Sequence, residues 1–235
     1  MIAVLLAGGK GTRLAPFTIS LPKPLMPVGN RPILEILIRQ LKDAGVKKVI
    51  ICVGYLESLI RSYFGDGKKF GVEIVYSSED EPLGTAGPMK LIAEHLTDTF
   101  FFMNGDLFTD INLDEMVNFH RQNKATATIG LTRKMVNIDF GVIKINDKKE
   151  FSEWKEKPTL EYLVSMGIYV FEPSVLKHLP DGFYNVPDLI VKLHEVNEKV
   201  IGYQYNGNWL DIGRLEDYQR ACQQMEELEN KNNGK

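Results

Sequence analysis

The residues best suited to chemistry form a glycine-rich segment near the amino terminus, Gly8-Gly9-Lys10-Gly11-Thr12-Arg13. Glycine adopts positive φ without steric cost, so these glycines allow main-chain N–H groups to converge on an anion. Arg13 adds a planar fork of donors that suits phosphate oxygens. Further on, Lys23 stands between Pro22 and Pro24, whose fixed φ values predict a stiff, extended chain and a restricted ammonium group. Together these residues predict a polyphosphate site.

Each feature also has an ordinary explanation, because glycines after a strand often make only a tight turn and a lysine between prolines is often a solvated loop residue. Two named phosphate motifs do not fit. The dinucleotide fingerprint requires glycine where Leu14 stands, and the P-loop requires Ser or Thr directly after Gly-Lys, where the chain has Gly11. Any phosphate site here must therefore belong to another class.

Composition limits the class of protein. The chain has 235 residues, of which 44% are hydrophobic and 25% charged, enough for one α/β domain with a substantial core. A net charge of −3 gives no general attraction to nucleic acid or to acidic membranes. The two cysteines, Cys52 and Cys222, suggest neither a disulfide framework nor a metal site. With no leader-like start and no long apolar run, we expect a cytoplasmic protein.

Helical and strand patterns alternate along the first half of the chain, which predicts parallel pairing with helical crossovers. The expected fold class is therefore α/β, a Rossmann-like doubly wound, mostly parallel sheet. The expected strands are residues 2–7, 49–53, 72–77, 100–103, 126–131 and 200–205, and the expected helices are residues 31–44, 56–64, 85–96, 113–123, 186–195 and 215–229.

The second half changes rhythm between residues 140 and 171. Apolar runs at 140–145, 151–154 and 165–171 are joined by turn-forming residues, which predicts antiparallel strands. We expect them to form a small flap over the sheet edge. No linker or repeat divides residues 1–235, so a single domain is expected, without a further domain at its C-terminal end.

A carboxylate follows the most apolar of the expected strands. Phe100-Phe101-Phe102-Met103 leads into Asn104-Gly105-Asp106. Open α/β sheets bind ligands at the carboxyl ends of their strands, so Asp106 should face the same crevice as the glycine loop. An aspartate that caps the next turn is the competing explanation.

The glycine loop and the Pro-Lys-Pro segment resemble the GGxGTR and P-K-P signature of the sugar-1-phosphate nucleotidylyltransferases. Asp211 in Trp209-Leu210-Asp211-Ile212-Gly213 resembles the W-x-D-x-G segment of this family, and Glu156-Lys157-Pro158 resembles its E-K-P motif. Nearly the whole chain is covered. The resemblance implies the nucleotide-diphospho-sugar transferase fold, with the antiparallel strands on the sugar side.

The resemblance also implies roles for particular residues. Asp106 and Asp211 would hold catalytic Mg²⁺, a cation that prefers hard oxygen ligands, and Lys157 would hold the sugar phosphate. Sugar-side contacts are implied for Gly141, Glu156, Gly167 and Tyr169. The expected nucleotide contacts are Leu6, Ala7, Gly8, Gly9, Gly11, Thr12, Arg13, Lys23, Glu79, Gly84, Thr85 and Asp106.

Base preference depends on residues 78–88, Ser-Glu-Asp-Glu-Pro-Leu-Gly-Thr-Ala-Gly-Pro. The small residues Gly84 and Thr85 let the backbone approach a flat base, and a carboxylate can accept the paired N–H donors of guanine. The segment resembles the mannose-1-phosphate guanylyltransferases more than the thymidylyl or uridylyl branches. An acidic run before a helix can equally be a solvated first turn.

The expected reaction joins a nucleoside triphosphate, GTP favoured, to a sugar 1-phosphate, mannose 1-phosphate or a related hexose or heptose favoured, and releases pyrophosphate. Because the attacking phosphate is already ionised, its second pKa being about 6, no general base is needed. The alternatives are thymidylyl or uridylyl transfer to glucose or N-acetylhexosamine phosphates, a phosphocholine cytidylyltransferase, a non-catalytic nucleotide-sugar binding module and, least favoured, a nicotinamide oxidoreductase. We expect no nucleic-acid or membrane partner, and a homodimer remains open.

Overall fold

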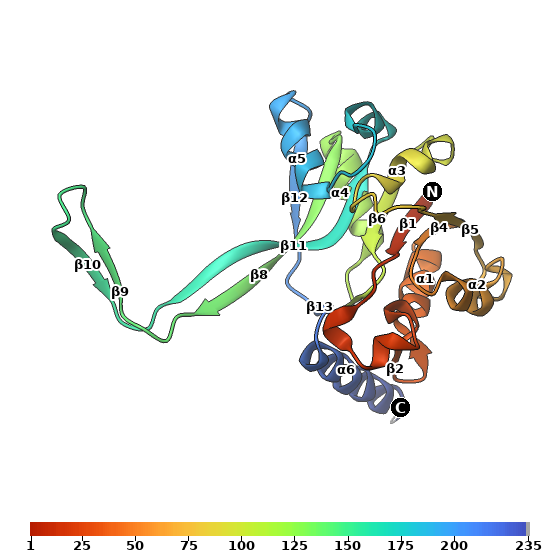
Figure 1. Cartoon of the computed structure of the whole chain (residues 1–235), viewed down its shortest axis with the longest axis horizontal. Helices are drawn as coiled ribbons and strands as arrows, with labels where there is room; N and C mark the ends of the chain where they lie inside the picture. Colours follow the sequence, from red (N-terminus) through yellow and green to blue (C-terminus); the bar gives the residue numbers. More distant parts are fainter. Residues whose placement is uncertain (234–235) are drawn as a thin grey trace.

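The computed structural model describes residues 1–233, and its centre is a seven-stranded sheet in the order β12-β8-β11-β6-β1-β4-β5 (Figure 1). Neighbouring strands pair in parallel except at β11, which runs antiparallel to both β6 and β8. The prediction of a mostly parallel α/β sheet is confirmed. The strands are β1 (Ile2–Ala7), β4 (Lys48–Val53), β5 (Glu73–Ser78), β6 (Phe100–Asn104), β8 (Ala127–Asn137), β11 (Thr159–Phe171) and β12 (Val200–Gln204).

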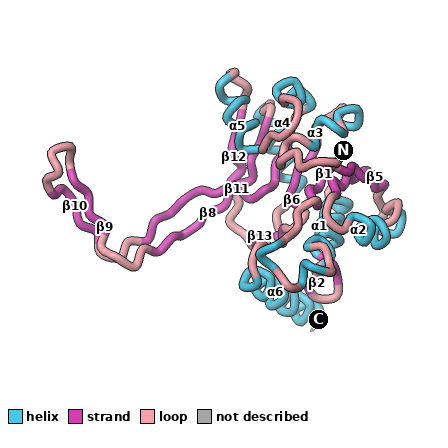
Figure 2. Tube along the Cα trace, in the orientation of Figure 1, coloured by secondary structure: helices cyan, strands magenta, loops and turns pink. Residues whose placement is uncertain are grey.

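Helices cover both faces of the sheet, as a doubly wound fold requires (Figure 2). Successive strand residues point to opposite faces, so Leu5 and Ile51 enter one core while Val4 and Ile50 enter the other. The first core is covered by α1 (Ile33–Asp43), α2 (Glu57–Phe64) and α4 (Leu113–Asn123), and the second by α3 (Pro88–Leu91) and α5 (Val186–Glu195). Burial on both faces explains why these strands are continuously apolar in sequence.

A third, smaller core lies under the segment that follows the glycine loop. Leu14 and Met26 from this segment pack with Phe108, Ile212 and Ala221. The cluster joins α6 (Leu215–Asn233) to three short strands, β2 (Pro27–Val28), β7 (Leu107–Thr109) and β13 (Trp209–Asp211), while β3 (Arg31–Pro32) pairs with β2. Within residues 1–233, no helix is long and apolar enough to cross a membrane.

The antiparallel strands form a long arm instead of a flap over the sheet edge. β8 and β11 remain paired as far as Asn137 and Thr159. Beyond this point, β9 (Val142–Ile145) and β10 (Phe151–Lys155) pair as a separate hairpin at the tip. Figures 1 and 2 show the arm projecting away from the sheet and its helices. The antiparallel pairing of these strands was predicted correctly, but the prediction that they lie over the sheet edge was wrong.

The predicted helix at residues 85–96 is also wrong in extent. Only Pro88–Leu91 is α-helical, and a 3-10 turn follows at Ala93–His95. The Ala86 and Gly87 N–H groups donate instead to the Tyr184 carbonyl, at 2.8 and 3.2 Å. This segment is therefore bound to the Tyr184 loop, which local sequence cannot reveal.

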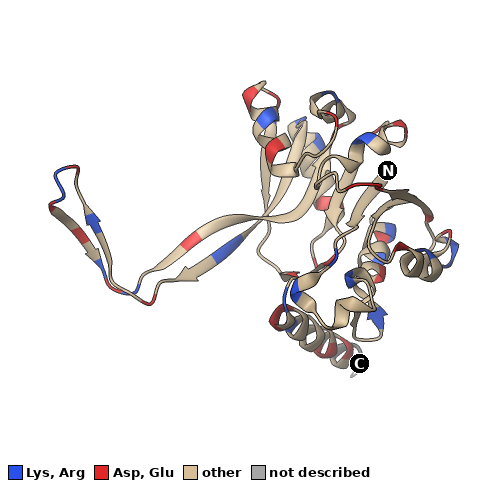
Figure 3. Cartoon of the chain, in the orientation of Figure 1, with Lys and Arg blue, Asp and Glu red and all other residues tan. Residues whose placement is uncertain are grey.

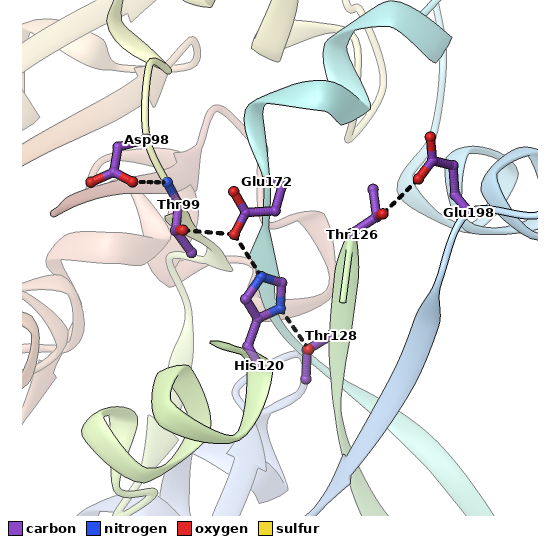
Figure 4. Close-up of polar contacts among 7 residues, drawn as sticks. All are labelled: Asp98, Thr99, His120, Thr126, Thr128, Glu172 and Glu198. Carbon is purple, nitrogen blue, oxygen red and sulfur yellow. Dashed lines mark hydrogen bonds and ion pairs between the residues drawn. The ribbon is translucent and has the colours of Figure 1, made fainter. Parts of the chain in front are cut away.

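A buried polar network lies at the sheet edge where β6 begins and β11 ends (Figure 4). His120 on α4, 1% exposed, has Nδ1 2.7 Å from Thr128 Oγ1 and Nε2 3.0 Å from Glu172 Oε1. Thr99 donates to the same Glu172 oxygen at 2.7 Å. Burial lowers the pKa of His120, although the neighbouring Glu172 acts in the opposite direction. The network ties α4 to the ends of three strands.

This network should make folding stability depend on pH. Because the His120 pKa is lower in the folded protein, the unfolded chain binds more protons as pH falls. Its contribution is complete above about pH 6.5, the unfolded value, and is lost on acidification. His120→Gln should cost about 1–3 kcal/mol at pH 7.5 and reduce the loss of stability between pH 7 and 5. Urea unfolding at both pH values measures this. The matched control, exposed His194→Gln, should leave the pH dependence unchanged, and an unaltered slope in His120→Gln would contradict the assignment.

Candidate active site

The glycine loop and Asp106 come together because β1 and β6 are neighbours in the sheet. Leu6 pairs with Asn104, and the Gly105 N–H donates to the Leu6 carbonyl at 2.9 Å. A Cβ at Gly105 would lie 2.6 Å from that carbonyl oxygen, so the approach requires glycine. Asp106 is therefore held beside the end of β1, where the loop begins.

Asp211 reaches the same place through a pairing that sequence patterns did not predict. In the two-stranded sheet of β7 and β13, Asp211 pairs with Leu107. The Ile212 N–H then donates to the Asp106 carbonyl at 3.1 Å. The two strands are only three residues long each, too short to show a periodic pattern. They bring together two carboxylates that are far apart in the chain.

Lys23 lies between these carboxylates. Its ammonium group forms an ion pair with Asp106 Oδ2 and lies 3.9 Å from Asp211 Oδ1. The Lys23 side chain is 10% exposed, against 45% for Asp211. Pro22 is extended as predicted, but Lys23–Leu25 forms a 3-10 turn, so the prediction of an extended chain through Lys23 is wrong. The turn buries Lys23 and directs it inward.

The charges in this cluster favour binding of a second cation in addition to the Lys23 ammonium group. Burial, followed by repulsion from Asp106, raises the pKa of Asp211, whereas Lys23 and Arg13 act to lower it. Asp106 Oδ1 is buried and accepts no hydrogen bond from the described residues. Carboxylate oxygens with free lone pairs suit a hard cation such as Mg²⁺. Because residues 1–233 contain no cluster of three or more His, Cys, Asp or Glu ligands, such a cation would need further ligands from substrate or water.

Two adjoining cavities open at this edge and share Leu6, Gly9 and Asp106. The larger, about 560 Å³, extends toward residues 79–85, and the smaller, about 230 Å³, toward Lys23. The first is lined by the predicted residues Leu6, Gly8, Gly9, Glu79, Gly84, Thr85 and Asp106. The second is lined by Leu6, Ala7, Gly9, Gly11, Thr12, Arg13, Lys23 and Asp106. All the predicted nucleotide-side residues thus face one connected crevice.

The larger cavity also has walls that sequence reasoning missed. Cys52, Gly54 and Tyr55 line it from the end of β4, and Phe183 lines it from the loop before α5. Cys52, Gly54 and Tyr55 lie at the carboxyl end of a parallel strand, as Asp106 does. The rule that ligands bind at these strand ends could therefore have predicted them from the sequence. Phe183 had no such signal. Cys52 is buried, and burial raises its pKa to about 12.

The predicted sugar-side residues divide into two groups. Tyr169 lines a third cavity of about 360 Å³ with Asn104 and Asp188, and Gly167 packs against Asn104. A Cβ on Gly167, whose φ is +71°, would lie 2.5 Å from Asn104 Nδ2.

The other group lies at the tip of the arm. Trp154 Nε1 donates to Glu156 Oε2 at 3.0 Å, and a Cβ on Gly141 would lie 2.6 Å from Trp154 Cζ2. Lys157 follows with a positive φ of 42°. Gly141, Glu156 and Lys157 therefore lie together where the β9–β10 hairpin begins and ends. Figure 1 shows this hairpin far from the sheet, whose strand ends line the cavities.

The glycine loop and both aspartates fall within a known family pattern. The sequence profile of the family described as "Nucleotidyl transferase" matches residues 2–228. The chain belongs to this family. A crystal structure of a candidate glucose-1-phosphate thymidylyltransferase from Bacillus anthracis, in complex with a sucrose, superposes with a TM-score of 0.77 at 26% identity, covering 94% of both chains.

Curated members of the nucleotidyl transferase family are similar over almost the whole chain. A UTP–glucose-1-phosphate uridylyltransferase from Synechocystis is 35% identical over 99% of this chain and 65% of its own length. A mannose-1-phosphate guanylyltransferase from Mycobacterium tuberculosis is also 35% identical, over 93% of this chain and 63% of its own length. This chain therefore spans less than two thirds of either relative. The chain is equally identical to enzymes that are named for different bases and sugars. Sequence identity therefore does not indicate which base or which sugar it binds, and only the residues of the site can do so.

The ion-pair geometry predicts opposite responses at the two aspartates. Asp106→Asn removes the charged partner of the buried Lys23 and should cost about 1–3 kcal/mol of stability in metal-free protein. Asp211→Asn relieves repulsion between carboxylates and should be neutral or slightly stabilising. Urea unfolding in EDTA compares the variants directly. Equal destabilisation would show that Asp211 is a structural partner of Lys23.

Proposed function

We propose that this protein transfers a nucleoside monophosphate from a nucleoside triphosphate to a sugar 1-phosphate, with release of pyrophosphate. The observation that carries the proposal is the cluster of Lys23, Asp106 and Asp211 at the junction of two cavities. It combines a buried cation with two carboxylates, one of which has an unpaired oxygen. Membership of the nucleotidyl transferase family supports the same reaction.

Main-chain and side-chain donors of the first loop would hold the triphosphate. Gly9, Gly11 and Thr12 line the smaller cavity, where N–H groups could meet phosphate oxygens. Arg13 lies against Gly213, where an added Cβ would be 3.4 Å from its Nη2, so its guanidinium borders the Asp211 side of the site. These groups would place the α-phosphate near Lys23 and Asp106.

A divalent cation, Mg²⁺ in our proposal, fits Asp106 and Asp211, which would hold it while it neutralises charge on the phosphate oxygens. The side chains of the protein would contribute by positioning the two substrates. Lys23 lies within the cluster to stabilise charge that develops at the α-phosphate. Because the incoming sugar phosphate is already ionised, its second pKa being about 6, no proton acceptor is required.

The larger cavity would hold the base and favours guanine. Glu79, Asp80 and Glu81 all line it, and a carboxylate can accept from both N1–H and N2–H₂ of guanine. One Glu79 oxygen already accepts the Leu83 N–H at 2.8 Å, so Asp80 and Glu81 are the freer acceptors. We propose GTP as donor and mannose 1-phosphate, or a related hexose or heptose phosphate, as acceptor.

The geometry weighs against the phosphocholine alternative. A quaternary ammonium group requires aromatic faces around one point. Trp154 lies at the tip of the arm and Tyr169 in the sheet, so these two aromatics do not meet in the described structure. Thymidylyl and uridylyl transfer remain the nearest competitors, because relatives of both kinds are similar to this chain.

A substrate panel tests the proposal. Each nucleoside triphosphate would be paired with mannose, glucose and N-acetylhexosamine 1-phosphates in Mg²⁺, and pyrophosphate release measured. We expect the highest kcat/KM with GTP and mannose 1-phosphate and no turnover in EDTA. Preference for UTP or dTTP would refute the base assignment alone. No pyrophosphate release with any pair, together with tight binding of a nucleotide sugar, would identify a binding module instead.

Lys23 provides the sharpest single-residue test. Lys23→Ala should lower kcat by roughly 100-fold or more, as expected for loss of one charge-stabilising donor in a buried site. Lys10→Ala is the matched control, because Lys10 lines the larger cavity but is exposed, and it should retain most of the activity. Steady-state kinetics at saturating substrates measures both. More than half the wild-type kcat in Lys23→Ala would remove Lys23 from the mechanism.

A further inference from the structure

The arm is an unusual structure for a chain in water. β12 pairs with β8 only as far as Leu131, and β6 pairs with β11 only from Ile168 onward. Between residues 132–137 and 159–164, the two strands therefore pair only with each other. An isolated two-stranded ribbon is marginally stable, and free edges invite another chain. Packing against another protein surface would therefore stabilise the arm.

Large apolar side chains are exposed along the whole arm. Phe140 is 77% exposed and Phe151 66%, at positions where a soluble domain would normally bury aromatic rings. The other large apolar residues exposed on the arm are Met135, Val136, Ile143, Ile145, Trp154, Tyr162 and Leu163. They occur in both strands of the ribbon and in the tip hairpin, so exposed apolar side chains are present along the full length of the arm.

The arm is fixed where it leaves the sheet. A bulge at residues 165–169 marks this point, and its Met166 carbonyl accepts the Trp209 Nε1–H at 2.9 Å. The Ser165 and Tyr169 hydroxyls lie 2.9 Å apart, and Gly167 packs against Asn104. Folding the arm back onto its own domain would require these contacts, or the ladder beyond them, to break.

Distance separates Lys157 from the cavity of its own domain. Thr159 and Gly167 lie on one extended strand, so roughly 25 Å separate them at about 3.3 Å per residue, and Lys157 lies beyond Thr159. A lysine side chain is far too short to cover that distance. The Lys157 side chain therefore cannot contact Asn104 or Tyr169 of its own chain.

The cavity beside Asn104 lacks the charge that its proposed ligand requires. Its described lining includes the carboxylate of Asp188 but no Lys or Arg, although a sugar phosphate is an anion. Among the described residues, neither Asp188 in this cavity nor Lys157 on the arm forms a salt bridge. Figure 3 shows both basic and acidic positions on the tip of the arm, away from the sheet and its helices. Lys157 would supply the positive charge that this cavity lacks.

We infer that two copies of this chain exchange arms, so that each arm tip docks at the cavity beside Asn104 and Asp188 of the other copy. The partner's Lys157 would supply the missing cation, and the exposed apolar residues of the arm would be buried against the second body. Two-fold symmetry makes the contact reciprocal, so both sites are completed together. The assignment of this cavity to the sugar phosphate rests on the proposed function.

Complementation between two inactive variants tests the exchange. Asp106→Asn removes a body residue and Lys157→Ala removes an arm residue, and each alone should be inactive at sugar-phosphate concentrations below the wild-type KM. Co-expressed with different affinity tags, they should form mixed dimers in which one of the two sites is intact. Two-fold pairing at random then predicts about a quarter of wild-type activity before purification through both tags and about half after it.

Each other outcome has a definite meaning. A monomeric wild-type protein in light scattering would overturn the inference, as would tagged mixed dimers without restored activity. Full activity of the Lys157→Ala variant alone would overturn the inference that Lys157 of one copy acts in the cavity of the other. Phe140→Ser with Trp154→Ser should shift the protein toward monomer, whereas the control Lys148→Ser with Lys149→Ser should retain the dimer.

A cross-linking experiment keeps the inference testable without activity. In a Cys222→Ser background, a Lys157→Cys chain and an Asp188→Cys chain would be mixed and treated with a short bis-maleimide. Arm exchange predicts a covalent heterodimer on a denaturing gel, whereas arms that fold back onto their own chain predict none. If wild-type protein releases no pyrophosphate but this cross-link forms, the proposed function fails and the arm exchange stands.

Discussion

The ammonium group of Lys23 between Asp106 and Asp211 is the interaction on which the rest of the site depends. Two carboxylates brought together in a half-buried crevice repel each other, and the raised pKa of Asp211 reflects both its burial and that repulsion. Lys23 offsets the repulsion in the absence of any other cation. The surrounding backbone, from the Gly105 contact to the β7–β13 pair, serves to hold these three groups in place.

The same arrangement explains why one buried oxygen has no partner. Lys23 engages only one oxygen of Asp106, and the other is enclosed without a hydrogen-bond donor from the described residues. An unsatisfied buried acceptor costs free energy in folding. Such a cost persists where it creates a binding position, and a hard cation would remove it. The unpaired oxygen of Asp106 therefore lowers the stability of the cation-free protein, and binding of a cation would restore it.

Sequence patterns predicted the parts of the fold that depend on local periodicity. Strand β1 and helices α4 and α5 have the expected bounds, because their apolar spacing reports directly which face is buried. The carboxyl-edge rule placed Asp106 correctly beside the glycine loop. Sequence patterns failed where a distant segment decides the conformation. Ala86 and Gly87 bond to Tyr184 instead of continuing a helix, and β13 is defined by its pairing with β7.

The third core also makes the site depend on the order of synthesis. Leu14 and Met26 emerge from the ribosome early, but they pack against Ile212 and Ala221, which emerge much later. Amino-terminal elements fold first during translation. A nascent chain can thus form the glycine loop and the strands around it long before Asp211 arrives. The crevice is completed only after residues 209–221 have been made, so a nascent chain that stops before them contains Lys23 and Asp106 but lacks the second carboxylate of the cation site.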